Sequence, residues 1–333
     1  VNSLRINNAE ITFGVGGSII GTESLNTNNG IFRLLDGVNR GLSGVFLNSA
    51  TGIIELENSG SLNGGTLNNQ GTIKKTGSGN AKISGLTFHQ YHDAATTTNP
   101  NILVQDGTLQ FENSSSIWEN SVVQTSGNGK FIFTRFNYAD PTTGFAEVSL
   151  KGNNRWSGAA GSIQLLTGGR LLGYDDFGTS ADDNDTYYLE ASGDNFPLLI
   201  NGGQFYGRNK LILRGTTDIT QNGAYLSNMK NQGTIKLEST SLDISENFTN
   251  LPSAIVEIAG TNSQISTSYR VTLNNQGTIK KTGSGNAGII VDNFNQSNAN
   301  LVVEGGILTI SRSIFPGNAD WSNVNFTFSN NAI

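Results

Sequence analysis

A sixteen-residue segment, TLNNQGTIKKTGSGNA, occurs twice without change in this chain, at residues 66–81 and again at 272–287. A partial copy, NQGTIK, begins at Asn231, which precedes the equivalent Asn275 by 44 residues. This offset equals two units of 22, and a further 22 residues beyond Ile279 lies Leu301, where another apolar alternation begins. Self-similarity at a fixed period of roughly 20–50 residues is typical of chains built from stacked structural repeats. The repeat therefore predicts a solenoid with about 22 residues per coil.

Within the units, apolar residues recur at the spacing i, i+2, i+7, i+9. One unit shows it at Ile102, Val104, Leu109 and Phe111, and the same spacing begins again at Leu301. Alternation with a period of two indicates strands with one buried face, and the gaps contain Gly, Ser or Asp, as turns do. No stretch shows the period of 3.6 that an amphipathic helix requires. We therefore expect an all-β chain folded as a single parallel β-helix.

Glycine and asparagine explain how such coils can turn. The 333 residues include 42 Gly and 43 Asn, and only 14% are charged. This composition excludes a coiled coil, a helical bundle and an α/β enzyme with long crossover helices. Both residue types tolerate the left-handed backbone of tight corners, and stacked Asn side chains can hydrogen-bond from coil to coil as amide ladders. Hydrophobic residues make up 35% of the chain, which is enough for a core.

Composition and net charge also limit the kinds of partner that the chain is expected to have. With no cysteine, the chain has no disulfide, thiol nucleophile or cysteine-ligated zinc. A net charge of −6 argues against nucleic acid. No apolar run approaches the roughly 20 residues that span a bilayer, so we expect no membrane insertion. The Asn-, Gly-, Thr- and Ser-rich, cysteine-free composition suits an extracellular or cell-surface protein of a bacterium.

The repeat also carries a resemblance to a known group. The unit NNQGTIKKTGSGNA, together with FNQSNANLVVEGGILTI at residues 294–310, resembles repeats of secreted bacterial surface β-solenoids. These include filamentous-haemagglutinin-like adhesins and autotransporter passenger regions. The resemblance covers residues 50–110 and 225–312 and is compositional elsewhere. It implies a right-handed parallel β-helix with an exported, surface or matrix role, and it does not imply an enzyme.

The domain organisation follows from the repeat and from where it is interrupted. We expect one continuous β-solenoid over residues 1–333, with irregular loop insertions in the middle, where residues 112–222 keep strand-like runs but lose the repeat. Two insertions are predicted: an acidic loop at 173–187 and a small loop at 91–98. Irregular insertions on a solenoid gather on one face, which is often the binding face.

The acidic loop is the one strongly charged segment. Between Arg170 and Arg208 there are seven acidic residues and no Lys or Arg, so the rest of the chain carries a net charge of +1. Clustered carboxylates suit calcium, and the candidate ligands are Asp175, Asp176, Asp182, Asp183 and Asp185. The loop lacks the Gly and distal Glu of an EF-hand and the nonapeptide of calcium-binding β-rolls. A solvated acidic loop without metal is therefore favoured, with calcium as the alternative, and no other cofactor is expected.

Histidines and aromatic residues offer two further hypotheses. His89 and His92 form a close pair without a third ligand nearby, so a metal-free loop pair is favoured. Aromatic side chains on the surface could stack on sugars, which would make glycans a partner, although most aromatic residues in such a fold are core. The candidates for sugar contact are Trp118, Trp156, Tyr174, Tyr187, Tyr188, Tyr206 and Trp321.

An enzyme is the main rival interpretation, because parallel β-helices also carry polysaccharide lyases and glycoside hydrolases. Asp175, Asp176 and Asp194, close to Arg170 and Arg208, could serve either chemistry. The chain has no G-x-S-x-G elbow, phosphate loop or H-E-x-x-H motif. We therefore predict that it is not an enzyme, with a polysaccharide-binding or polysaccharide-degrading β-helix as the alternative.

The last prediction concerns self-association through the two ends of the solenoid. Strand-like alternation without an obvious polar cap occurs at Leu4 and Ile6, and again at Val324, Phe326 and Phe328. Solenoid ends expose unpaired strand edges that must be capped or used for joining. We therefore expect a structural or adhesive rod whose copies associate end to end into a filament.

Overall fold

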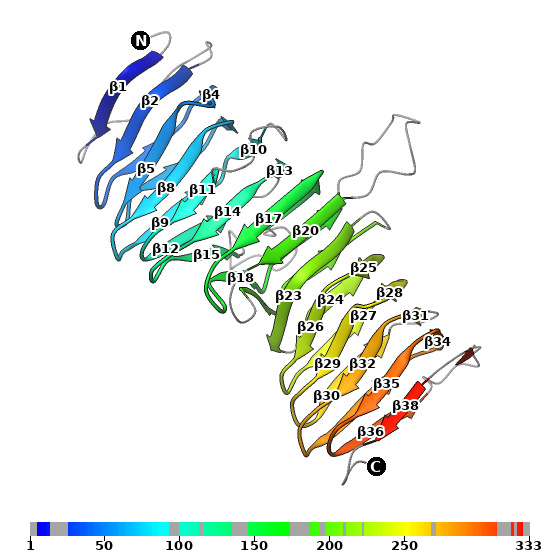
Figure 1. Cartoon of the computed structure of the whole chain (residues 1–333). Coiled ribbons are helices and arrows are strands. Elements are labelled where there is room, and N and C mark those ends of the chain that lie inside the picture. Colours follow the sequence, from blue (N-terminus) through cyan, green and yellow to red (C-terminus); the bar gives the residue numbers. More distant parts are fainter. Residues whose placement is uncertain are drawn as a thin grey trace, which may run out of the picture.

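A computed structural model describes the chain in twelve ranges: 5–13, 26–92, 100–112, 116–134, 146–173, 187–192, 197–208, 211–221, 223–267, 271–311, 321–322 and 325–328. In these ranges the chain forms 38 β-strands and no helix. The strands stack into a parallel β-solenoid with about 22 residues per turn, which confirms the predicted fold class. Figure 1 shows an elongated stack with β1 and β38 at opposite ends. That residues 1–333 form a single domain stays a prediction.

Each regular turn contributes one strand to each of three parallel sheets, which we name faces 1, 2 and 3. In spatial order, face 1 consists of the first parts of β1 (Arg5–Phe13) and β2 (Asn26–Leu34), then β4 (Val45–Asn48), β7 (Thr66–Asn69), β10 (Thr87–Tyr91), β13 (Ser116–Glu119), β16 (Ala146–Lys151), β19 (Gly169–Gly173), β22 (Gln204–Tyr206), β24 (Ala224–Ser227), β27 (Ser241–Ile244), β30 (Ser263–Thr267), β33 (Asn286–Ile290) and β36 (Ile307–Ser311).

Face 2 begins with the second parts of β1 and β2. It continues with β5 (Ile53–Glu57), β8 (Thr72–Thr76), β11 (Ile102–Val104), β14 (Val122–Thr125), β17 (Asn153–Ser157), β20 (Tyr187–Ser192), the first part of β23 (Leu211–Gln221), β25 (Met229–Asn231), β28 (Phe248–Asn250), β31 (Thr272–Asn275), β34 (Asn293–Ser297) and β37 (Trp321–Ser322).

Face 3 closes each turn. It consists of β3 (Asn39–Gly41), β6 (Ser61–Asn63), β9 (Asn80–Ser84), β12 (Thr108–Glu112), β15 (Lys130–Phe133), β18 (Ile163–Leu166), β21 (Leu198–Asn201), the second part of β23, β26 (Thr234–Leu237), β29 (Ile255–Ile258), β32 (Thr278–Lys281), β35 (Asn300–Val303) and β38 (Asn325–Phe328).

The alternating apolar residues form the core, as their spacing predicts. Ile102, Val104, Leu109 and Phe111 are all fully buried, two on face 2 and two on face 3. The 22-residue step is seen directly in the register, where Leu301 pairs with Ile279 of the preceding turn. Every inward side chain therefore packs between those of the turns before and after it, which makes the core one continuous column.

The two identical segments occupy different faces. In the first copy, TLNN, TIKKT and NA fall on β7, β8 and β9, which belong to faces 1, 2 and 3. In the second copy TLNN, TIKK and NA fall on β31, β32 and β33, which belong to faces 2, 3 and 1. The repeat therefore specifies strands and corners locally, and its copies are displaced by one face around the axis.

Glycine makes the one described bend within a strand on the way from face 2 to face 3. Gly215 lies inside β23 with φ +76°, a left-handed conformation. A Cβ atom there would lie 1.7 Å from the carbonyl oxygen of Ala191 on the preceding turn. Elsewhere the corners use Asn as expected, since Asn58, Asn120 and Asn228 also have positive φ.

Two buried amide ladders run along corners of the solenoid. The first joins Asn28, Asn48, Asn69 and Gln90: each Nδ2 donates to the amide oxygen of the next turn at 2.8, 2.7 and 2.7 Å. The second has the same design at 2.9, 2.8 and 2.7 Å, and it joins Asn231, Asn250, Asn275 and Gln296. The first ladder lies at the corner between faces 1 and 2, and the second lies at the corner between faces 2 and 3. The ladder is therefore displaced around the axis by one face, as the second copy of the repeat is.

A buried lysine marks each copy of the repeat. Lys75 and Lys281 occupy the same place in the two segments, and both are fully buried. Lys75 Nζ donates to the carbonyl oxygens of Thr76 at 2.7 Å and of Asp106, one turn further on, at 3.3 Å. Lys281 Nζ donates to the carbonyl oxygen of Gly283 at 3.0 Å. Burial lowers the pKa of both amines, and each ammonium group is hydrogen-bonded to carbonyl oxygens of the adjoining corner.

Candidate functional site

The predicted calcium ligands lie outside the described residues. Gly173 ends β19 and Tyr187 begins β20, and Asp175, Asp176, Asp182, Asp183 and Asp185 all fall between them. Residues 93–98 of the predicted small loop are likewise outside the described ranges. Where the chain is described, no three His, Asp or Glu side chains are grouped as a metal site would require. Calcium binding stays a prediction.

The aromatic candidates for sugar contact separate into two groups. Trp118 and Trp156 are fully buried and Tyr187 is nearly so, so for these three residues the sugar hypothesis is wrong. Each occupies an inward position of its strand, because every second side chain of a strand points into the core. Tyr188 and Tyr206 point outward and are partly exposed. Tyr174 and the side chain of Trp321 are not among the described parts.

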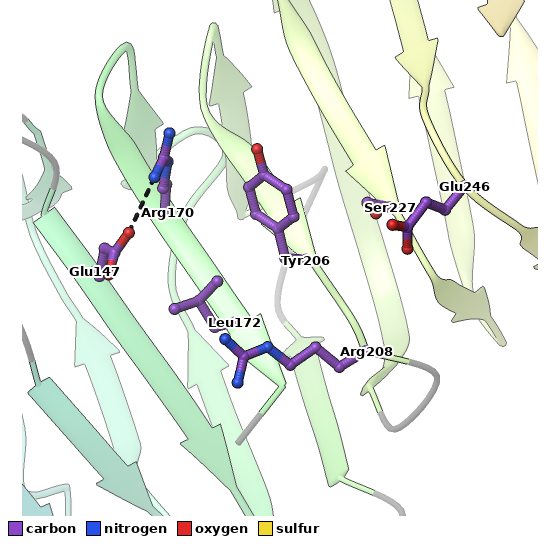
Figure 2. A pocket seen from close by; sticks show the side chains of 7 residues that line it. All are labelled: Glu147, Arg170, Leu172, Tyr206, Arg208, Ser227 and Glu246. Carbon is purple, nitrogen blue, oxygen red and sulfur yellow. Dashed lines mark hydrogen bonds and ion pairs between the residues drawn. The ribbon is translucent and has the colours of Figure 1, made fainter. Parts of the chain in front are cut away.

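A groove of about 390 Å³ crosses face 1 over several turns, and we name it the face-1 groove. It brings together Arg170 and Arg208, which are 38 residues apart in sequence and which the sequence analysis placed at the two limits of the acidic segment. Figure 2 shows its lining side chains, which come from β16, β19, β22 and β24 and from the corners that follow β22 and β27. They are Glu147, Arg170, Leu172, Tyr206, Arg208, Ser227 and Glu246.

Polar contacts order the centre of this groove. Arg170 Nη1 lies 3.0 Å from Glu147 Oε1 on the preceding turn, and Arg170 Nε donates to Gln204 Oε1 on the following turn at 2.8 Å. The hydroxyl of Tyr206 donates to the same Gln204 oxygen at 3.3 Å. The Arg170 guanidinium also lies 5.6 Å from the centre of the Tyr206 ring. Three consecutive turns therefore fix one another's side chains.

Tyr206 is the aromatic residue of the groove. Its ring centre lies 5.2 Å from that of Tyr225 on the next turn. Partial burial raises the pKa of the Tyr206 phenol, and the nearby Arg170 opposes this only in part. The hydroxyl is therefore protonated at neutral pH and can donate a hydrogen bond.

A smaller hollow of about 230 Å³ lies on face 2. Arg155, Glu190 and Arg214 stack there in register on three consecutive turns. The Arg214 guanidinium lies 3.6 Å from the ring centre of Tyr188, and its Nε donates to Gln232 Oε1 at 2.8 Å. These groups satisfy one another, so the hollow resembles a surface polar network.

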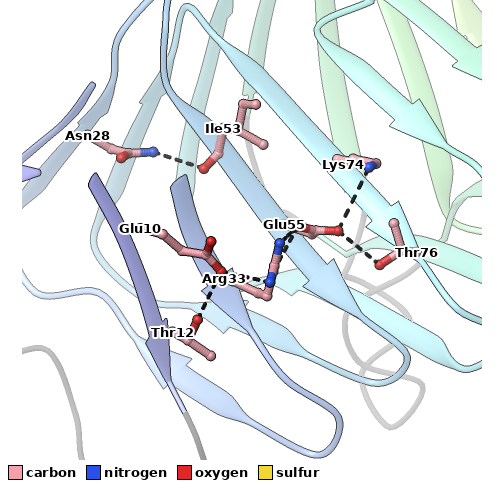
Figure 3. Close-up of polar contacts among 8 residues, drawn as sticks. All are labelled: Glu10, Thr12, Asn28, Arg33, Ile53, Glu55, Lys74 and Thr76. Atoms are coloured by element: carbon pink, nitrogen blue, oxygen red, sulfur yellow. Dashed lines mark hydrogen bonds and ion pairs between the residues drawn. The ribbon is translucent and has the colours of Figure 1, made fainter. Parts of the chain in front are cut away.

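Charges of opposite sign stack along the faces in the same way elsewhere. Figure 3 shows the ladder on face 2 near β1, where Arg33 lies 2.7 Å from Glu10 and 2.9 Å from Glu55. Lys74 of the next turn lies 3.8 Å from Glu55. Such exposed pairs each contribute only about 0–1 kcal/mol. Their alternating signs favour the native register, since a slip of one turn would place like charges together.

Face 3 carries a similar column of charged side chains, in which Asp218 has a carboxylate oxygen without a hydrogen bond. Asp218 stacks above Lys236, Glu257 and Lys280 of the next turns. Its Oδ1 is buried and accepts no hydrogen bond. Burial, with the nearby Glu238 carboxylate, raises the pKa of Asp218 to about 6, although Lys236 opposes the shift. Asp218 therefore keeps its proton to a higher pH in the folded chain than in the unfolded one.

Asp218→Asn is expected to stabilise the chain above pH 6 and to have little effect below pH 4. Between those values the folded state keeps a proton that the unfolded chain has released, so the free energy of unfolding falls as pH rises. The neutral amide removes this loss, by about 1 kcal/mol at pH 7 after allowance for solvent screening. Unfolding curves from pH 3.5 to 8 measure it. Asp243→Asn, at an exposed acid, is the control, and equal pH profiles for the two variants would contradict the assignment.

The end of the stack that carries β36, β37 and β38 is the second candidate site. Phe326 and Phe328 pair in register with the buried Leu301 and Val303, so they hold core positions. Among the described strands no turn follows, and the two rings are 48% and 59% exposed. Of the other predicted self-association residues, Leu4 and Val324 are outside the described ranges. For Ile6 only the backbone, in β1, is described.

Comparison with known proteins gives no match for this chain. No family model, curated protein or solved structure matches it. In the described ranges, no helix is long and apolar enough to cross a membrane.

Proposed function

We propose that this chain is a structural or adhesive rod of a bacterial surface or matrix, and that its copies associate end to end. The supporting observation is the exposure of Phe326 and Phe328 at core positions of the last described turn. Burying such rings contributes roughly 1.5–3 kcal/mol each. A second solenoid stacked on this end would continue the core column.

The strand order at the two ends is compatible with such a junction. β1 lies on faces 1 and 2 and pairs, among the described strands, only with β2. At the other end, β36 lies on face 1 and β37 on face 2, and each pairs with one preceding strand. A second copy whose β1 lies against β36 and β37 would extend both sheets in the same parallel sense. Unpaired backbone groups at both ends would then be satisfied.

An extracellular location is part of the same proposal. The chain has no cysteine, and only 14% of its residues are charged. A rod held by coil-to-coil hydrogen bonds needs no metal, disulfide or cofactor to stay stiff. Surface fractionation of cells that produce the chain tests the location.

The double variant Phe326→Glu/Phe328→Glu is expected to weaken self-association at least tenfold, because two carboxylates would replace the apolar contact at the junction. Light scattering at graded concentrations measures the association, and negative-stain microscopy shows whether the particles lengthen. Val45→Glu, at an exposed apolar residue on face 1, is the matched control and should behave as the unaltered chain. A wild-type chain that stays monomeric at high concentration would overturn the filament proposal.

A further inference from the structure

The face-1 groove presents hydrogen-bonding side chains in two rows along the solenoid axis. In one row, Glu147, Arg170, Gln204 and Tyr225 are register neighbours on consecutive turns. Tyr206 lies in the adjacent row. Neighbouring turns are ~4.8 Å apart, which is close to the length of one pyranose unit in an extended glycan chain. A linear sugar polymer could therefore repeat its contacts turn by turn.

The charges of the groove balance. It contains two guanidinium groups, from Arg170 and Arg208, and two carboxylates, from Glu147 and Glu246. A polyanion would meet both carboxylates, which disfavours nucleic acid and uronate chains. Sugar hydroxyls both donate and accept hydrogen bonds, so they suit a surface that offers guanidinium donors and carboxylate acceptors side by side.

Arg208 has an unusual backbone that points to a role for its side chain. It has φ +50°, whereas the left-handed residues at this corner in other turns are Asn120, Gly152 and Asn228. An arginine in this conformation costs roughly 1 kcal/mol relative to glycine. In Figure 2 its side chain extends back from β22 beside Leu172, along the groove. A strained position that keeps a long cationic side chain over a groove is typical of a functional site.

We propose that the face-1 groove binds a neutral oligosaccharide whose chain runs along the solenoid axis. One sugar ring packs against the ring of Tyr206, since the apolar face of a pyranose suits an aromatic surface. Its hydroxyls accept hydrogen bonds from Arg170 and Arg208 and donate to Glu147 and Glu246. The contacts of Arg170 with Glu147 and Gln204 hold the side chains of Arg170 and Glu147 in place before the ligand binds. This binding is separate from the end-to-end junction.

The test is calorimetric titration of the full chain with linear hexasaccharides: cello-, xylo-, manno- and chitohexaose as neutral probes, and hexagalacturonate as the acidic one. We expect at least one neutral probe to bind and the acidic probe to bind at least tenfold more weakly. Tyr206→Ala is expected to reduce the affinity for the bound probe at least tenfold. Absence of binding by every neutral probe, or preference for hexagalacturonate, would overturn the proposal.

Arg208→Asn separates binding from folding. Asparagine tolerates the left-handed backbone, so this variant is expected to be at least as stable as the unaltered chain while losing affinity about tenfold. Tyr188→Ala, in the face-2 hollow, should leave the affinity unchanged. Unchanged affinity in both Tyr206→Ala and Arg208→Asn would place the ligand elsewhere. Repeating the titration in the Phe326→Glu/Phe328→Glu background keeps the result independent of self-association.

Discussion

Replacing Trp118 with alanine is expected to lower the free energy of unfolding by about 4 kcal/mol, because it empties the centre of an aromatic cluster. Trp118 is fully buried on β13. Its ring centre lies 5.4 Å from Phe111 and from Phe133, 5.7 Å from Phe88 and 6.0 Å from Trp156. These residues come from three consecutive turns, so the cavity would loosen all of them together. Chemical denaturation, followed by far-ultraviolet circular dichroism, measures the change.

Two conservative variants test whether packing alone explains this loss. The indole Nε1 of Trp118 is buried without a hydrogen-bond partner, whereas that of Trp156 donates to Ser121 Oγ at 3.1 Å. Trp118→Phe keeps most of the ring and removes an unpaired donor, so it should cost less than Trp156→Phe, which also removes a hydrogen bond. A larger loss for Trp118→Phe would show that an unseen partner holds its indole.

The architecture could be predicted from sequence because each turn of the solenoid is specified by patterns that involve only residues of the same or the next turn. Period-two alternation placed Ile102, Val104 and Leu109 in the core, and the 22-residue offset paired Ile279 with Leu301. Both inferences need only neighbouring turns, which are about one repeat apart in sequence. The expected use of Asn and Gly at corners follows from the same local chemistry, and Asn58 and Gly215 show it with positive φ.

The displacement of the second repeat by one face could not be predicted in this way. The repeats themselves are identical, so nothing in them records how many strands lie between. The count depends on the irregular middle of the chain, where β23 serves two faces and bends at Gly215. The local alternation predicts which side chains of a strand point inward. The face to which the strand belongs depends on the number of strands that precede it along the chain.

The face-1 groove was only partly accessible to sequence reasoning. Tyr206 was a sequence-based candidate for sugar contact, whereas Arg170 and Arg208 were candidates only for the enzyme alternative, and the loop between the two arginines was expected to carry the site. Their meeting depends on Arg170 and Gln204 being in register across 34 residues, which an insertion of unknown path separates. Trp118 and Trp156 were misassigned because residue type alone does not give the side of a strand. The signal that separates Tyr206 from these two tryptophans is its outward position in the strand, next to the buried Phe205.

The proposed end-to-end rod and the proposed sugar-binding groove are compatible in one solenoid. The ends lie along the axis, where backbone edges and Phe328 are exposed, while the groove lies on the flank, where outward side chains repeat once per turn. A filament built through the ends would present one such groove per copy. Weak binding of a sugar chain by each copy would then add up to firm attachment through multivalency.

Asn48→Ala is expected to lower the free energy of unfolding by about 3 kcal/mol, the largest loss we predict for a polar residue. Asn48 accepts from Asn28 at 2.8 Å and donates to Asn69 at 2.7 Å. Its Nδ2 also lies 3.2 Å from the carbonyl oxygen of Gly52 and 3.3 Å from that of Thr72. Alanine would remove the acceptor of one N–H of Asn28, whose Nδ2 keeps the Ile53 carbonyl oxygen at 3.0 Å, and the donor to Asn69 Oδ1. Each buried group left unsatisfied costs roughly 1–3 kcal/mol. Equilibrium denaturation gives the size of the loss, and hydrogen exchange shows whether it is confined to the adjoining turns.

Asn250→Ala tests whether the second ladder is the same device on another corner. Asn250 repeats the pattern of Asn48: it accepts from Asn231 at 2.9 Å, donates to Asn275 at 2.8 Å, and lies 3.3 and 3.2 Å from two corner carbonyl oxygens. The two substitutions should therefore cost the same within about 1 kcal/mol, although they act on different pairs of faces. Asn29→Ala, which removes an exposed Asn–Asn contact beside the first ladder, should cost no more than about 0.5 kcal/mol. If Asn29→Ala were as costly as Asn48→Ala, burial of the ladder would not be what makes it stabilising. A large loss at only one of the two ladders would instead mean that the corner, and not the amide column, sets its strength.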